Sequence, residues 1–306
     1  PSPGGEAPPP SPARGEGQNP AVRLATLRRV ISAGAPASAA SLERFVKLLP
    51  DSAQVFTPYG ATEALPVANI GNREILAETR HLTDQGKGVC VGRPVPGMEV
   101  SVIAISDEPI PEWSDALKLP PGEIGEFVVR GPVVTRRYFN RPEATALAKI
   151  RDPRTGEVLH RMGDVGYIDD AGRLWFCGRK SHRVVTPHGT LFTDMVEPIF
   201  NTVPGVFRTA LVGIKRNGVV RPWVCVEPHD YGSALRNYPR WRAELRATAQ
   251  RFELTRELVS FAPFPEFPVD VRHNSKIFRE KLAAQLDSML KPGGYFSGDS
   301  TPEGGT

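Results

Sequence analysis

The sequence predicts a mixed α/β fold, with a β-rich part in its middle and an α+β part after it. Short strand patterns with Gly and Pro punctuation fill residues 92–179. Helical spacing of apolar residues precedes them, and both patterns alternate after Arg179. A length of 306 residues agrees with about two domains. We therefore divide the chain into residues 1–20, 21–179, 180–290 and 291–306.

The first elements are marked by turn and cap residues. Residues 1–20 hold seven prolines and four glycines, so we expect a mobile segment that cannot offset its ordering entropy. Val30 and Ile31 predict a short buried strand that ends at Gly34. Ser38 is a typical N-cap for a helix that Pro50 stops. A strand at 53–56 should then lead into a loop at 57–60.

The later elements follow from alternation and helical periodicity. We expect strands at 100–105, 125–130, 211–214, 219–226 and 259–261, a hairpin turn at 169–172, and helices at 142–149, 193–200, 241–252 and 274–290. Thr193 is expected to cap the second of these helices. The tail from residue 291 to residue 306 is expected to be flexible.

The composition excludes several classes of protein. The 38 basic and 34 acidic residues are interspersed and leave a net charge of only +4, so no basic footprint for nucleic acid is present. No run approaches the roughly 18 apolar residues that a membrane span needs. Three widely separated cysteines fit neither a disulfide framework nor a zinc site. These features favour a reducing, cytoplasmic location.

Four blocks of residues stand out, and their order is more specific than any one of them. They are residues 59–63 (YGATE); 122–126 (GEIGE) with 130–132 and 138–145 (YFNRPEAT); 163–167 (GDVGY) with 178–180 (GRK); and 274–277 (NSKI). In this order they resemble the adenylate-forming superfamily, which includes acyl-CoA synthetases, fatty-acyl-AMP ligases and nonribosomal peptide adenylation domains. The resemblance covers about residues 24–290 and implies an AMP-forming ligase that uses ATP and Mg²⁺. It also implies that residues 21–179 are the end of the large AMP-binding domain with its β-rich subdomain, and that residues 180–290 are the small C-terminal α+β lid domain.

The resemblance also implies roles for particular residues, and their chemistry suits those roles. Gly34, Ala35 and Pro36 would lie against adenine, and Tyr59 would offer a ring for stacking beside Gly60. Thr62 offers a hydroxyl to phosphate, and Glu63 offers a hard oxygen ligand to Mg²⁺. Asp164 accepts from the ribose hydroxyls, and Arg179 donates to ribose or phosphate. Lys276 would bridge the carboxylate and the α-phosphate during adenylation.

Each of these residues also has an ordinary structural interpretation. A Thr-Glu pair commonly begins a helix, and an aspartate after Gly163 commonly occupies a turn. Lys276 alone would be a solvated lysine near a helix end, and here Ser275 stands where the superfamily usually has glycine. Pro142 and Glu143, although they lie in a matching block, are interpreted as a helix start.

One branch of the superfamily matches especially well. Acyl-CoA synthetases usually carry a Gly-Gly pair in the pantetheine channel, where this chain has Pro187 and His188, and Met195 replaces the usual acidic residue. Residues 57–66, 88–94 and 268–274 instead resemble the olefin-biosynthesis β-lactone synthetases. That resemblance implies a fatty-acid substrate, most specifically a long-chain β-hydroxy acid, and other enzymes of the same pathway as partners. His182 and His273 are the candidates for the base that activates the β-hydroxyl.

Three hypotheses therefore remain at this point. The first is a β-lactone synthetase, the second a fatty acyl-CoA or fatty-acyl-AMP ligase, and the third a truncated, non-catalytic nucleotide-binding chain. Nothing between Pro1 and Tyr59 resembles the superfamily's Gly-rich phosphate loop. We expect this chain to be the C-terminal portion of a longer protein, with a hinge near Lys180, and to be inactive alone.

Overall fold

The computed structural model describes residues 23–270 and 273–291, so the segments predicted to be mobile at 1–20 and after 291 lie outside the described residues. Its largest element is a nine-stranded sheet with the order β1-β2-β3-β4-β9-β8-β6-β5, in which β7 pairs with β8. The strands are β1 (Arg29–Ile31), β2 (Gln54–Ala61), β3 (Ala64–Gly71), β4 (Val89–Pro94), β5 (Glu99–Ile103), β6 (Gly125–Arg130), β7 (Lys149–Arg151), β8 (Val158–Ile168) and β9 (Leu174–Arg179). Short helices flank it: α1 (Ala39–Val46), α2 (Asn72–Glu74), α3 (Arg80–Asp84) and α4 (Pro142–Ala148).

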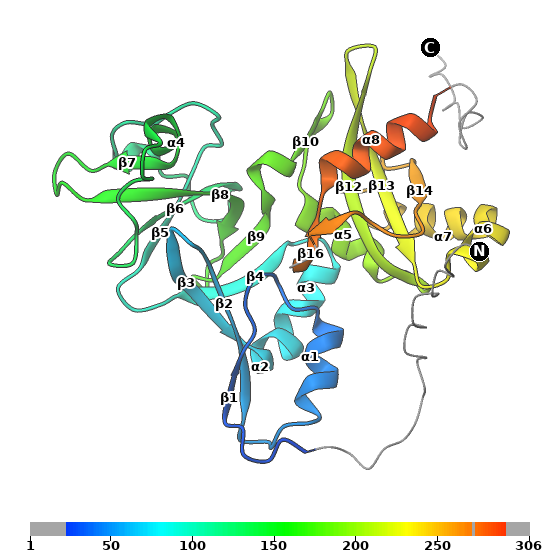
Figure 1. Cartoon of the computed structure of the whole chain (residues 1–306), viewed down its shortest axis with the longest axis horizontal. Helices are drawn as coiled ribbons and strands as arrows, with labels where there is room; N and C mark the ends of the chain where they lie inside the picture. The colour runs from blue at the N-terminus through cyan, green and yellow to red at the C-terminus, as the bar shows by residue number, and fades with distance from the viewer. Residues whose placement is uncertain (1–22, 271–272, 292–306) are drawn as a thin grey trace, which may run out of the picture.

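The remainder of the chain forms a second group of elements, drawn from light green to red in Figure 1. Its strands are β10 (Val184–Thr186), β11 (Gly189–Leu191), β12 (Val206–Arg216), β13 (Val219–Pro228), β14 (Phe261–Pro263), β15 (Val269–Asp270) and β16 (His273–Ile277). Its helices are α5 (Thr193–Asn201), α6 (Tyr231–Arg236), α7 (Tyr238–Gln250) and α8 (Arg279–Met289). One 3₁₀ turn, Lys180–His182, connects the two groups.

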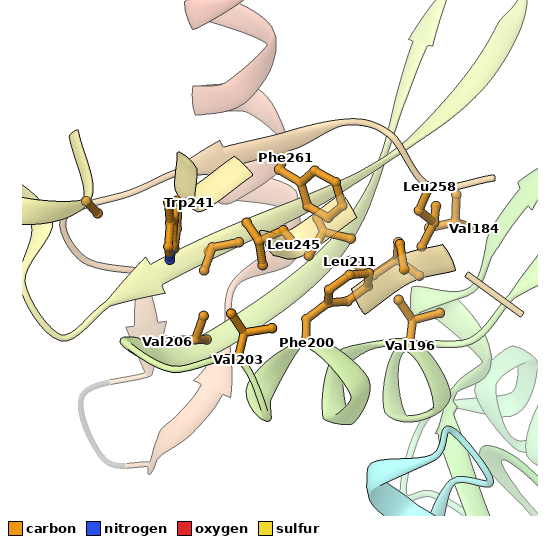
Figure 2. Packing of buried hydrophobic residues seen from close by; sticks show 14 residues of the cluster. Val184, Val196, Phe200, Val203, Val206, Leu211, Trp241, Leu245, Leu258 and Phe261 are labelled. Carbon is orange, nitrogen blue, oxygen red and sulfur yellow. The ribbon is translucent and has the colours of Figure 1, made fainter. Parts of the chain in front are cut away.

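The two groups have largely separate cores. Helices α5 and α7 pack on the sheet β12-β13-β14, with the fully buried Phe200 and Phe261 rings edge to face at 5.4 Å (Figure 2). In the nine-stranded sheet, Phe127 of β6 is the centre of another buried cluster. A smaller apolar contact around Phe192 and Val165 joins the groups beside the connection. Within the described residues, no helix is long and apolar enough to cross a membrane.

The nine-stranded sheet brings together side chains of strands that are not neighbours in it. The Tyr59 ring of β2 lies 6.1 Å from the Phe127 ring and 6.2 Å from the Phe176 ring, measured between centroids. Strand β2 is three positions away from β9 in the strand order. Tyr59 of β2 therefore lies against side chains of β6 and β9, and this contact positions it for the candidate site.

Most predicted elements are confirmed. Helix α1 begins after Ser38, whose hydroxyl accepts from the Ser41 N–H at 3.2 Å. Strand β6 has the predicted bounds, 125–130. The hairpin turn at 169–172 is closed by a Gly172 N–H that donates to the Asp169 carbonyl at 2.9 Å. The mixed α/β fold is confirmed as well.

Four local predictions are wrong. The strand at Val30 and Ile31 is not buried, because β1 is at the edge of the sheet and Ile31 is 65% exposed. Residues 57–60 form no loop, because antiparallel pairing with β3 extends β2 to Ala61. The helix expected from residue 274 begins only at Arg279, since residues 273–277 pair with β15 instead. Thr193 is the first residue of α5 and not its cap: its hydroxyl donates to Asp194 at 2.8 Å, and Phe192 occupies the cap position.

Candidate nucleotide-binding site

Three of the predicted site residues contact one another. Asp164 on β8 and Arg179 on β9 are directly opposite in the antiparallel pair, and Arg179 Nε lies 3.1 Å from Asp164 Oδ1. The Tyr59 hydroxyl donates to Asp164 Oδ2 at 2.7 Å. Asp164 is buried, whereas about half of the Arg179 side chain is exposed. A buried acceptor thus lies beside a cation that solvent or a ligand can reach.

The Asp164 carboxylate retains acceptor capacity. Oδ1 is buried and has no hydrogen bond of acceptable geometry, although Arg179 is close enough for an ion pair. Burial raises the pKa of Asp164 to about 6, against the opposing effects of the Arg179 guanidinium and the Tyr59 hydroxyl. A pair of ligand hydroxyls would supply the missing donors, which fits the ribose role that the sequence assigns to this residue.

The predicted adenine segment follows β1, which pairs with the strand that carries Tyr59. Strands β1 and β2 are parallel, and the Ser32 N–H donates to the Phe56 carbonyl at 2.9 Å just beyond the end of β1. Gly34, Ala35 and Pro36 follow this bond, while β2 continues toward Tyr59. The carboxyl ends of parallel strands commonly bound a ligand site. Gly60 is required nearby, since a methyl group on it would lie 2.5 Å from the Ala64 carbonyl oxygen.

Thr62 and Glu63 form the two-residue turn of the β2–β3 hairpin, because Ala61 pairs with Ala64. They do not begin a helix. Thr62 is exposed, and Glu63 is partly buried. The Tyr138 hydroxyl donates to Glu63 Oε1 at 2.7 Å. Partial burial by itself would raise the pKa of Glu63, but this hydrogen bond and the local backbone lower it, so the carboxylate is ionised at neutral pH.

Two buried basic residues, Lys149 and His160, lie close enough to Glu63 for its charge to affect them, and neither belongs to a motif in the sequence. Lys149 Nζ donates to Thr135 Oγ1 at 3.0 Å, and burial lowers the pKa of Lys149 to about 8 despite the Glu63 carboxylate. His160 contacts the Ala148 carbonyl at 3.1 Å, and burial together with the Lys149 charge lowers the pKa of His160 to about 4. Only the position of Tyr138 in a matching block signalled this region.

Lys276 is separate from these residues. It lies on β16 with an exposed side chain. Among the residues that the structure describes, no hydrogen bond or ion pair joins Lys276 to Asp164, Arg179 or Glu63. Its role in adenylation therefore stays a prediction.

The departures from the CoA-ligase pattern lie outside this cluster. Pro187 and His188 are the exposed turn between β10 and β11, where the His188 N–H donates to Thr186 Oγ1 at 3.1 Å. His182 is half-buried beside the connection, and burial lowers its pKa. The side chain of His273 lies outside the described residues.

The residues present fit a nucleotide with a divalent cation. Asp164 Oδ1 is a buried acceptor without a donor, and Glu63 is an ionised carboxylate in the turn that follows the strand carrying Tyr59. The described residues contain no group of three His, Cys, Asp or Glu side chains that could hold a metal ion. A Mg²⁺ ion here would therefore take most of its oxygen ligands from phosphates and water, as is common for this ion.

Comparison with known proteins shows which proteins this chain resembles. Residues 8–139 match the family "AMP-binding enzyme". The chain is 51% identical over 88% of its length to the olefin β-lactone synthetase of Stenotrophomonas maltophilia, and it covers 48% of that protein. It is also 51% identical over 86% of its length to the olefin β-lactone synthetase of Xanthomonas campestris, covering 47%. The chain thus spans about half the length of these relatives.

Solved structures show the same fold at lower identity. The amide bond synthetase McbA of Marinactinospora thermotolerans superposes with a TM-score of 0.63 at 24% identity, over 85% of this chain and 47% of that one. The O-succinylbenzoate coenzyme A synthetase of Bacillus subtilis, in complex with AMP, gives a TM-score of 0.61 at 22% identity, over 83% and 45%.

Proposed function

Because this chain resembles the adenylate-forming superfamily and, within it, the olefin β-lactone synthetases, we propose that it supplies the ribose-binding and C-terminal part of an ATP-dependent ligase. The ligase would activate a fatty-acid carboxylate as acyl-AMP. One observation carries the proposal: the buried, incompletely paired Asp164 lies between Tyr59 and Arg179. A nucleotide's ribose would complete the hydrogen bonding of that carboxylate.

The adenylation step follows from the charges that must be handled. The substrate carboxylate attacks the α-phosphorus of ATP, a C–O–P linkage forms, and pyrophosphate leaves. A Mg²⁺ ion, when bound, would neutralise phosphate charge, and Glu63 would hold it. Thr62 would donate its hydroxyl to a phosphate oxygen. Lys276 would reach the reacting oxygens with its cationic side chain. A positive group is needed there to stabilise the negative charge of the transition state.

The substrate class we propose is a long-chain β-hydroxy acid. Identity of 51% to two olefin β-lactone synthetases supports this choice. In the second step the β-hydroxyl oxygen would attack the activated carbonyl carbon, lose its proton to a base, and expel AMP as the four-membered ring closes. The nucleophile is tethered to the electrophile, so a high effective molarity takes the place of a second substrate.

An acyl-CoA or acyl-AMP ligase is the second candidate. The relatives include the 2-succinylbenzoate–CoA ligase of Arabidopsis thaliana, which is 26% identical over 61% of this chain. Pro187 and His188 weigh against a thioester-forming enzyme, because a proline ring and an imidazole would narrow a channel that glycines leave open.

Product analysis separates the candidates. The chain would be joined to the portion of the Stenotrophomonas maltophilia relative that it does not span, then supplied with ATP, Mg²⁺ and a β-hydroxy fatty acid, with and without coenzyme A. We expect AMP, pyrophosphate and a β-lactone by mass spectrometry without coenzyme A. A fatty acid lacking the β-hydroxyl should be adenylated at most. A coenzyme A thioester as the main product would restore the ligase hypothesis.

The same assay addresses the third hypothesis. The 306-residue chain alone should give neither product. If the chain alone binds ATP and the fusion forms neither an adenylate nor a lactone, the non-catalytic nucleotide-binding hypothesis is the correct one. If the chain does not bind ATP at all, the assignment of Asp164 is wrong.

A further inference from the structure

We propose that Tyr138 is a positioning residue, whose hydroxyl orients the Glu63 carboxylate toward a nucleotide-bound divalent cation. The inference rests on the proposed function and deepens it. Tyr138 belongs to the block at residues 138–145, in which the sequence alone predicted a helix start and no role for this tyrosine. In the folded chain, its hydroxyl donates to Glu63 Oε1 at 2.7 Å. That bond connects the β2–β3 hairpin to a segment more than seventy residues further along the chain.

Tyr138 is itself held by contacts to its backbone and to its ring. Its backbone N–H donates to Thr145 Oγ1 at 3.1 Å, and that hydroxyl donates in turn to the Arg141 carbonyl at 2.8 Å. The Lys149 ammonium lies 5.8 Å from the centre of the Tyr138 ring, over its face. The first turn of α4 and the start of β7 therefore hold the tyrosine in place before any ligand arrives.

The same segment also holds the backbone of Glu63. The Thr135 N–H donates to the Glu63 carbonyl at 2.8 Å, and Lys149 fixes the Thr135 hydroxyl. Glu63 is thereby restrained at its main chain and at one carboxylate oxygen. Within the part of the chain that the structure describes, no ion pair occupies the Glu63 carboxylate, so a cation could bind to it. Outer hydrogen bonds of this kind orient metal-binding carboxylates, and their loss typically lowers metal affinity 10- to 100-fold, in order of magnitude.

The test measures the dependence of ATP binding on Mg²⁺. The 306-residue chain and its Tyr138→Phe variant would be titrated with ATP by ligand-detected NMR, once with excess Mg²⁺ and once with EDTA. Tyr138→Phe should reduce the enhancement by Mg²⁺ by about tenfold. Its affinity for ATP in EDTA should equal that of the wild type. Glu63→Gln should reduce the enhancement as well.

Tyr167→Phe is the matched control. The Tyr167 hydroxyl also donates to an oxygen, the Lys87 carbonyl at 2.9 Å, and its ring stacks on Trp175 at 6.0 Å between centroids. Because its hydroxyl donates to the Lys87 carbonyl and not to Glu63, this variant should keep the full enhancement by Mg²⁺. It excludes a general effect of removing a tyrosine hydroxyl.

Each outcome decides a particular claim. Full enhancement in Tyr138→Phe would overturn the positioning role while leaving the proposed function intact. Wild-type binding of ATP without any enhancement would remove the metal role of Glu63 and the inference with it. Wild-type failure to bind ATP in either buffer would overturn the assignment of Asp164, the observation on which the proposed function rests.

Discussion

Among single residues, Asp164 should set the pH dependence of nucleoside binding. Only the ionised carboxylate can accept from both ribose hydroxyls, and burial raises the pKa of Asp164 to about 6. Adenosine is a suitable probe, because it carries no phosphate that titrates in this range. Its affinity should be constant above pH 7 and fall by about tenfold per pH unit below pH 6. Asp164→Ala should weaken binding at pH 7.5 by roughly 2–4 kcal/mol without this pH dependence. A wild-type profile that stays flat to pH 5 would contradict the assignment.

The same carboxylate should reduce stability at neutral pH. The folded-state pKa exceeds the ordinary value of 3.8, so the folded chain binds more protons than the unfolded chain between about pH 4 and 6. The free energy of unfolding contributed by Asp164 is therefore present at low pH and is lost as pH rises through 6. Asp164→Asn should increase the free energy of unfolding at pH 7.5 by about 1–3 kcal/mol, which corresponds to a Tm higher by a few degrees. At pH 4 it should change the free energy of unfolding little. Thermal unfolding followed by circular dichroism at both pH values measures the difference.

Lys276 is expected to act in the chemical step and not in substrate binding. In the fusion protein described above, Lys276→Ala should slow pyrophosphate release by orders of magnitude and leave fatty-acid affinity nearly unchanged. Lys281→Ala, on the neighbouring helix α8, provides a control, since that ammonium lies over the Phe278 ring at 4.6 Å. Near-normal pyrophosphate release from Lys276→Ala would show that another cation performs the step.

Where β9 meets α5, the contact between the two groups of elements depends on the absence of a side chain. Gly178 has φ 136°, and a methyl group there would lie 2.4 Å from Thr193 Oγ1. Gly189 has a similar φ of 134°, but a methyl group there would meet nothing within 4 Å. Both alanine variants share the backbone strain, so their difference isolates the steric clash. Gly178→Ala should be about 1–3 kcal/mol less stable than Gly189→Ala in urea unfolding. Equal stabilities would mean that α5 moves aside without cost.

For the whole molecule, the separate cores predict that destabilising one group of elements leaves the amide hydrogens of the other protected from exchange. Phe200 is fully buried among α5, α7 and the sheet β12-β13-β14, and Phe200→Ala should cost about 3–5 kcal/mol there. We propose that residues 180–290 form a domain, so amide hydrogen exchange should increase in β12 and β13 while β6 and β8 stay protected. Phe127→Ala, in the core of the nine-stranded sheet, should give the reverse pattern. Uniform deprotection by either variant would indicate one cooperative unit.

Local features of the sequence were sufficient for much of this protein. The Ser38 cap, the strand at 125–130 and the turn at 169–172 depend on neighbours within a few residues, and all three are confirmed. The order of the motif blocks was also sufficient to predict the resemblance to the adenylate-forming superfamily and to its β-lactone synthetases. The sequence by itself determined these features, because caps and alternation depend on neighbouring residues and the order of motifs is visible along the chain without the fold.

The tertiary structure decided what depends on contacts between distant segments. Strand pairing with β3 and β15 overrode the local signals at residues 57–60 and 274–277. The fold brought the Tyr59 hydroxyl into hydrogen-bond contact with Asp164, 105 residues away, and the Tyr138 hydroxyl into contact with Glu63, 75 residues away. Burial then raised the pKa of Asp164, which its flanking glycine and valine could not reveal. Hydrogen bonding across the fold and desolvation depend on which strands become neighbours, and only the folded chain determines that.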